Sequence, residues 1–315
     1  MAAGHDDETS MIECDRVTVE RLGVVALERI DLSISAGQTV AVVGPTAAGK
    51  TSLLETFATL LPPRSGSLTI DGFAAGRQAD AIRRLVGYVP DGVPAWPAIR
   101  VDECLELFAA AGGLRGPGLT EAVGRVLATV GLARLAGSRC DAITTGQRKR
   151  LLLARSLLHE PAILLLDNPT AGLDPAGVAL VSQLVNDAQS IGRTVVASFN
   201  DADVPGGFTD LVVLHEGQLV QAGPCRPEAW PEVGSWHVRI ECPQAANEAA
   251  RAIGHIAIHC NCPDDNSLIC QLAPSRGPID ETVTTLVKAG IPVAGCRYDP
   301  PWPAQLIATI VPARD

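Results

Sequence analysis

The chain has 315 residues, of which 47% are hydrophobic and only 3% are aromatic. This length accommodates two medium-sized domains, and their cores must be built mainly from Ala, Val, Leu and Ile. The net charge of −10 and the pI near 5.1 argue against a general affinity for nucleic acid or anionic lipid, because both ligands attract a positive surface. We therefore expect no nucleic-acid partner.

The start of the chain shows no targeting signal. The first ten residues carry Asp6, Asp7 and Glu8 and no apolar segment, and no run in the chain approaches the ~18 apolar residues of a membrane span. The nine cysteines are odd in number and scattered, which fits reduced thiols better than a disulfide framework. These features predict a cytoplasmic protein, with residues 1–11 as a flexible tail.

The first predicted elements lead into a phosphate-binding motif. Residues 12–43 alternate apolar and polar positions and read as antiparallel strands that end in the β-branched run 39–43. A helix-like run follows from Thr51 to Leu61. The segment between them fits the pattern Gly-x4-Gly-Lys-[Ser/Thr] in its strand-loop-helix context. The predicted binding segment consists of Gly44, Pro45, Thr46, Ala47, Ala48, Gly49, Lys50, Thr51 and Ser52.

This pattern predicts a site for a nucleoside triphosphate with Mg²⁺. Backbone N–H groups of the loop and the positive end of the following helix surround phosphate oxygens. Lys50 reaches the β- and γ-phosphates, and the Thr51 hydroxyl ligates the metal ion. The alternative is a Gly- and Ala-rich turn without a ligand.

The following elements alternate between strands and helices. After a strand at 67–70, the pattern is helical from 101 to 158, with interruptions at 112–113 and 116–118. A short apolar run then ends in Asp167, which is typical of a buried parallel strand. Asp167 is a candidate to hold Mg²⁺ through water, and the alternative is that it caps the next turn. The alternation indicates an α/β fold, a P-loop NTPase core.

The last part of the chain reads as a separate small α+β domain. Residues 229–315 show alternating runs and helix-like segments in the order β-α-β-β-α-β. This segment also contains a cluster of possible metal ligands. Strand alternation and the lack of a Cys-x2-Cys pair favour packed residues over a zinc site. The cluster comprises His255, His259, Cys260, Cys262 and Cys270.

Residues 12–228 resemble the ATP-binding subunit of an ABC transporter. Residues 44–52 resemble Walker A, residues 163–170 resemble Walker B, and residues 171–174 resemble the D-loop. The small domain at 229–315 is similar in position to that of ABC-2 exporter ATPases. The resemblance implies antiparallel β and α-helical subdomains around the core, and it assigns a signature sequence to Thr144, Thr145, Gly146 and Gln147.

The resemblance fails at positions that matter for catalysis. Asn168 replaces the catalytic carboxylate, and an amide cannot take a proton from water. Asn200 replaces the switch histidine. Asp91 replaces a glutamine and is expected near Mg²⁺. Leu22 stands where an aromatic ring stacks on adenine, so it offers apolar contact without a π-face.

The nucleotide loops are altered as well. Thr46 and Ala47 replace the family's Asn and Gly in Walker A, and Thr145 replaces a signature glycine where backbone approaches phosphate closely. Asp174 and Asp201 are other carboxylates that could act as a base. Together the changes suggest that the phosphate site is kept while hydrolysis is weakened.

The resemblance implies the cytoplasmic ATP-binding subunit of a membrane exporter. Such a subunit dimerises with itself or with another ABC subunit, and it couples ATP binding to a membrane-spanning permease on a separate chain, at the inner face of the membrane. One alternative is a non-hydrolytic ATP-sensing subunit paired with a complete ABC ATPase. A second is a soluble ABC protein without a transport role.

Overall fold

The computed structural model describes residues 10–93, 96, 98–200, 204–226, 229, 235–272, 278–298 and 302–310. The chain divides into two compact units. The first contains residues 1–200 and 205–222, and the second contains residues 201–204 and 223–315. Residues 1–9 of the expected tail lie outside the described residues. Ser10 and Met11, also assigned to that tail, instead belong to a strand, because Ser10 pairs with Ser35.

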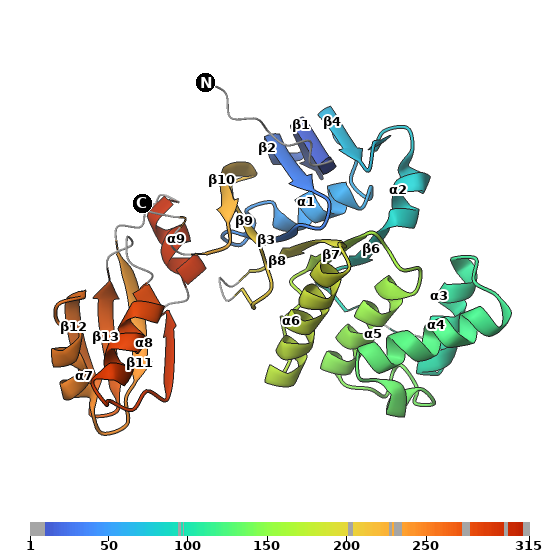
Figure 1. Cartoon of the computed structure of the whole chain (residues 1–315). Coiled ribbons are helices and arrows are strands. Elements are labelled where there is room, and N and C mark those ends of the chain that lie inside the picture. The colour runs from blue at the N-terminus through green and yellow to red at the C-terminus, as the bar shows by residue number, and fades with distance from the viewer. Residues whose placement is uncertain are drawn as a thin grey trace. The chain divides into compact units, whose positions relative to one another are not determined.

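A six-stranded sheet forms the centre of the first unit (Figure 1). Its strand order is β10-β9-β3-β8-β7-β6, and β3 pairs in parallel with both β8 and β9. Every residue of β3, β7 and β8 is buried, which explains why these segments are almost continuously apolar. The strands are β3 (Thr39–Val43), β6 (Val86–Val89), β7 (Ile163–Asp167), β8 (Thr194–Ser198), β9 (Asp210–His215) and β10 (Gln218–Pro224).

A second, antiparallel sheet packs with the first around α1 (Lys50–Phe57). Its order is β2-β1-β4-β5. Leu53, Leu54 and Phe57 of α1 are fully buried in a core that both sheets share. The strands are β1 (Ser10–Arg21), β2 (Val24–Ser35), β4 (Ser65–Ile70) and β5 (Phe73–Ala74).

The remaining helices of the first unit correct two expectations. Residues 116–118 were predicted to interrupt a helix, but they begin α4, because proline is well tolerated in the first turn. Residues 130–144 were predicted to be helical, but they connect α4 to α5 and contain only a 3-10 turn. The break at 112–113 is present. The helices are α2 (Ala79–Leu85), α3 (Val101–Ala111), α4 (Gly116–Thr129), α5 (Thr145–Leu157) and α6 (Pro175–Ser190), with a 3-10 turn at Ala133–Leu135.

The second unit is a four-stranded antiparallel sheet with helices. Its strand order is β12-β13-β11-β14, and the elements follow the predicted β-α-β-β-α-β order with one further helix, α9. Cys260 and Cys270 lie opposite each other on neighbouring strands; Cys270 is buried in the apolar core, and the partly buried Cys260 packs against it. The elements are β11 (Trp236–Glu241), α7 (Ala246–Ala252), β12 (Ala257–Asp264), β13 (Ser267–Leu272), α8 (Pro278–Lys288), β14 (Gly295–Tyr298) and α9 (Trp302–Ile310).

Within the described ranges, no group of three or more His, Cys, Asp or Glu side chains is arranged to hold a metal ion. Among the same residues, no helix has the length and apolar character needed to cross a membrane.

We expect the first unit to fold and to bind nucleotide without the second unit. A chain truncated after residue 229 retains the core cluster around α1 and the complete six-stranded sheet. We expect it to fold and to bind Mg-ATP with an affinity within about threefold of that of the full chain. Calorimetric titration checks this, and loss of binding in a truncated chain that still unfolds cooperatively would contradict it.

Candidate nucleotide-binding site

The phosphate loop has a backbone path that requires its two glycines. Gly44 has a φ of 151°, and a Cβ there would lie 2.1 Å from the carbonyl oxygen of Leu214. Gly49 has a φ of 103°, and a Cβ there would lie 2.7 Å from the carbonyl oxygen of Ala26. Side chains at these positions would collide with backbone. The loop between β3 and α1 is therefore fixed by close approach to neighbouring strands.

Lys50 lies inside this loop. Its side chain is buried, and Nζ donates hydrogen bonds to the carbonyl oxygens of Gly44 and Pro45, both at 2.8 Å. A buried ammonium needs such partners. The same position holds a positive charge beside the backbone that would surround phosphate.

Ala47 adopts an unfavourable backbone conformation within the loop. Its φ is 65°, in the left-handed region, where a Cβ costs roughly 1–2 kcal/mol relative to glycine. Ala47 and Thr46 are both exposed, whereas the next residue, Ala48, is buried. The loop therefore keeps the left-handed conformation that a glycine would accept more readily.

Asp167 lies at the carboxyl edge of the sheet, where β3 also ends. In the sheet register Ser198 of β8 is paired with Val42 on one side and with Asp167 on the other. The Ser198 hydroxyl donates to Asp167 Oδ1. Asp167 Oδ2 is buried and has no hydrogen-bond partner among the described residues. A buried carboxylate oxygen without a partner fits a hydrated Mg²⁺ ion.

The two asparagines follow the ends of adjacent strands. Asn168 comes directly after β7, and its backbone N–H donates to the carbonyl and the hydroxyl oxygens of Ser198. It has a φ of 49°, a conformation that Asn tolerates better than most residues. Asn200 is exposed just beyond β8. The fold thus brings Asn168 and Asn200 to the same sheet edge as the phosphate loop.

The signature segment forms the start of α5. Thr144 is its N-cap, with its hydroxyl accepting from the Gln147 N–H at 3.2 Å while the Gln147 side chain accepts from the Thr144 N–H at 2.9 Å. This is a capping box. Thr144 and Thr145 are exposed, and Gly146 is half-buried. The helix N-terminus is therefore fixed by its own residues and open to a ligand.

Leu22 lies at the tip of the β1-β2 hairpin. It has a φ of 51° and is 99% exposed, and Val24 beside it is also exposed. An exposed apolar tip is available for contact with a base.

Lys149 was not among the candidate site residues predicted from the sequence. It stands between Arg148 and Arg150 in the predicted helical segment, yet it is only 3% exposed. Its Nζ lies 2.5 Å from the carbonyl oxygen of Asn168 and 3.8 Å from Asp91 Oδ1. Burial lowers the pKa of Lys149, while the charges of Asp91 and Asp167 oppose this effect.

The other candidate carboxylates have their own contacts. Asp174 is the N-cap of α6, where it accepts from the Gly177 N–H at 2.8 Å, and it lies 3.1 Å from the Arg150 guanidinium. Asp91 is exposed but faces Lys149. Asp201 lies outside the described residues.

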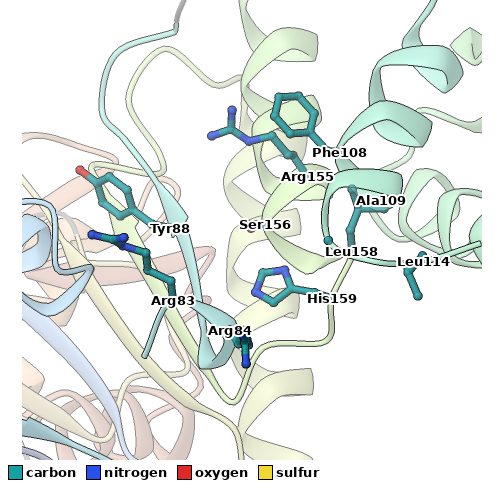
Figure 2. Close-up of a pocket in the computed structure, with 11 residues that line it drawn as sticks. Arg83, Arg84, Tyr88, Phe108, Ala109, Leu114, Arg155, Ser156, Leu158 and His159 are labelled. Carbon is teal, nitrogen blue, oxygen red and sulfur yellow. The ribbon is translucent and has the colours of Figure 1, made fainter. Parts of the chain in front are cut away.

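A separate pocket of about 590 Å³ lies between α2, the end of α3 and the end of α5 (Figure 2). The Arg155 guanidinium is 4.9 Å from the centre of the Phe108 ring. Burial lowers the pKa of Arg155. Among the described residues, the lining includes basic and apolar side chains but no carboxylate. Its charged or titratable members are Arg83, Arg84, Tyr88, Arg155 and His159.

The fold and the phosphate loop define a P-loop nucleotide-binding protein. Comparison with known proteins is more specific. Residues 27–171 match the family model described as "ABC transporter". The chain is 32% identical to the phosphate import ATP-binding protein PstB 2 of Natronomonas pharaonis over 64% of this chain and 76% of that protein. The chain belongs to the ATP-binding subunits of ABC transporters.

Other relatives agree with this assignment. The chain is 31% identical, over 63% of its length, to the "Probable multidrug ABC transporter ATP-binding protein YbhF" of Escherichia coli, and the match spans about a third (34%) of YbhF. Among solved structures, the dimeric ATP-binding cassette MJ0796 bound to ADP and Pi is similar with a TM-score of 0.64 and 26% identity. That match covers 69% of this chain and 99% of the cassette.

Our first prediction for this site concerns Lys50. Lys50→Ala removes the only positive charge inside the loop as described and should abolish detectable Mg-ATP binding in calorimetry. Lys288→Ala, at an exposed position of α8, is the control and should bind like the wild type. Equal ATP affinity for the wild type and Lys50→Ala would show that the loop is not the binding site.

Our second prediction concerns Ala47. Ala47→Gly removes the Cβ from a left-handed conformation and should raise the free energy of unfolding by about 0.5–1 kcal/mol. Ala48→Gly is the matched control, since it deletes a buried methyl group and should lower stability by about 1 kcal/mol. Denaturant unfolding measures both, and destabilisation by Ala47→Gly would contradict the account of this loop.

Proposed function

We propose that this chain is the ATP-binding subunit of an ABC-type exporter that works mainly through ATP binding and dimerisation, with slow or absent hydrolysis. The observation that carries the proposal is Asn168, at the position where the family has a catalytic carboxylate. Mg-ATP is the ligand, and the chain functions at the cytoplasmic face of a membrane through a permease.

The binding part of the proposal is supported by the phosphate loop and Asp167. The loop holds Lys50 beside its backbone, and Asp167 Oδ2 is buried at the same sheet edge without a partner among the described residues. Lys50 and the loop N–H groups would hold phosphate oxygens, while Thr51 and Asp167 would hold Mg²⁺, which supplies charge neutralisation when bound. These groups stabilise bound ATP without taking a proton.

Hydrolysis also needs a proton acceptor, and within the described part of the chain neither Asp91 nor Asp174 is free for that role. Asn168 and Asn200 can orient a water molecule but cannot act as a base at neutral pH. Asp91 faces the Lys149 ammonium. Asp174 is the N-cap of α6, and its carboxylate also contacts the Arg150 guanidinium. Positioned bases supply about 10²–10⁴-fold in rate, so their loss should slow turnover while leaving ground-state binding intact.

A second candidate function is a regulatory subunit paired with a complete ABC ATPase. Asn168 and Asn200 favour it, because a site that binds ATP without turnover can hold a dimer closed while the partner hydrolyses its own ATP. Thr144 and Thr145 of the signature are exposed, so the signature is available for dimerisation with either a second copy of this chain or a different subunit.

We also propose that the pocket in Figure 2 receives the membrane-spanning permease. It combines Arg155 with apolar groups, including Phe108 and Leu114, and within the described residues it has no acidic lining. A segment with an apolar face and a carboxylate would complement it.

The first test of the proposed function restores the missing groups. The wild type should release phosphate about 10²–10⁴-fold more slowly than complete ABC ATPases. Asn168→Glu with Asn200→His should raise the rate, and either change alone should raise it less. The left-handed φ of Asn168 should cost the Glu variant about 1 kcal/mol of stability, which a thermal unfolding measurement separates from its catalytic effect.

Two outcomes would contradict the hydrolysis assignment. One is a wild-type rate comparable to that of complete ABC ATPases and removed by Lys50→Ala. The other is an unchanged rate in a folded double variant that still binds ATP.

The second test concerns the pocket. Arg155→Glu should reduce the share of the chain that sediments with membranes containing its permease by about tenfold, since it reverses the charge at the interface. Arg125→Glu is the control on α4, at an exposed position outside the pocket lining. Equal sedimentation of the two variants would place the permease contact elsewhere.

A further inference from the structure

Lys149 connects the signature helix to segments of the chain's own nucleotide site. It lies on α5, in the turn that follows the capping box of Thr144 and Gln147. Its Nζ is surrounded by the carbonyl oxygens of Asn168 at 2.5 Å, Ala171 at 3.4 Å and Asp91 at 3.5 Å. Because Lys149 is only 3% exposed, these oxygens replace the water that would otherwise solvate its ammonium group.

The three carbonyls come from two segments that are far apart in the sequence. Asp91 follows β6, whereas Asn168 and Ala171 both lie in the connection between β7 and α6. A single side chain of α5 therefore links these two segments. Removing the ammonium would leave several carbonyl oxygens without this partner at once, which loosens their mutual placement.

Lys149 also forms an ion pair in this cluster. Asp91 Oδ1 lies 3.8 Å from Lys149 Nζ, so the carboxylate that replaces a glutamine faces a positive charge. Asp167 also acts on Lys149 through its charge. The neutral Asn168 contributes only its carbonyl oxygen.

We propose that Lys149 is a positioning residue that transmits nucleotide binding from the phosphate loop's sheet edge to the signature helix. Ordering of the segment after β7 by bound Mg-ATP fixes the Asn168 and Ala171 carbonyls, and through Lys149 this fixes the start of α5. This inference depends on the proposed function, because it requires Mg-ATP to bind at the phosphate loop.

Amide hydrogen exchange with and without Mg-ATP tests the proposal. In the wild type, ATP should slow exchange in three segments by about tenfold or more, namely 44–52, 168–172 and 145–150. In Lys149→Met, which has a similar length and no charge, protection of 44–52 should remain while protection of 145–150 is lost. Lys149→Arg should restore that protection, and Lys288→Met is the control for loss of an exposed lysine.

Asp91→Asn provides a second arm that keeps the buried ammonium. It removes the carboxylate but leaves the carbonyl contacts, so the ATP-induced protection of 145–150 should fall only partly, by about threefold. If Lys149→Met fails to fold, Lys149→Gln takes its place, because it keeps a hydrogen-bond donor but loses the charge. Full ATP-induced protection of 145–150 in a folded Lys149→Gln variant would overturn the proposal.

The remaining outcomes separate this inference from the proposed function. If ATP protects 44–52 but not 145–150 in the wild type, or protects both equally in Lys149→Met, the role of Lys149 is wrong and the nucleotide site stands. If ATP protects neither segment in the wild type, the proposed function and this inference are both wrong.

Discussion

The parallel pairing of β3, β7 and β8 is the constraint on which the site depends. Since Ser198 is paired with both Val42 and Asp167, the ends of these strands meet at one edge of the sheet. The phosphate loop and the two asparagines come just after these strands, and Asp167 ends one of them, so all of these groups lie at that edge. A shift of register would separate them, because the side chains of each strand are buried on both faces and alternate between those faces. The apolar core around α1 therefore supports the chemistry as well as the stability of the first unit.

Binding and hydrolysis make different demands on this edge. The proposed binding of Mg-ATP needs fixed donors and a carboxylate for the metal ion, and Lys50 and Asp167 are both buried. Hydrolysis needs a group that accepts a proton while water attacks. Asn168 offers a backbone N–H to Ser198 and its carbonyl to Lys149, so the residue at the catalytic position is held by structural contacts on both sides. Loss of the proton acceptor is therefore compatible with an ordered and stable site.

The sequence predicted the parts of the molecule that are encoded locally. The phosphate loop, the strand that ends in Asp167 and the order of strands and helices in the second unit are visible as short patterns. Lys149 could not be predicted, because its burial results from contacts with residues distant in the chain, and its neighbours Arg148 and Arg150 suggest a solvated basic face. The start of α4 at Gly116 was missed since Gly and Pro normally signal a break. The pocket beside Arg155 was missed for the same reason as Lys149, because its basic residues come from separate helices.

We propose that this chain holds ATP and hydrolyses it slowly or not at all. The most direct measurement is the identity of the nucleotide that stays bound. The protein is incubated with labelled Mg-ATP for many minutes, separated from free nucleotide and quenched in acid, and the bound label is resolved into ATP and ADP. We expect nearly all of the bound label to be ATP in the wild type, and we expect ADP to accumulate when Asn168→Glu and Asn200→His are combined. Bound ADP as the main product in the wild type would contradict it.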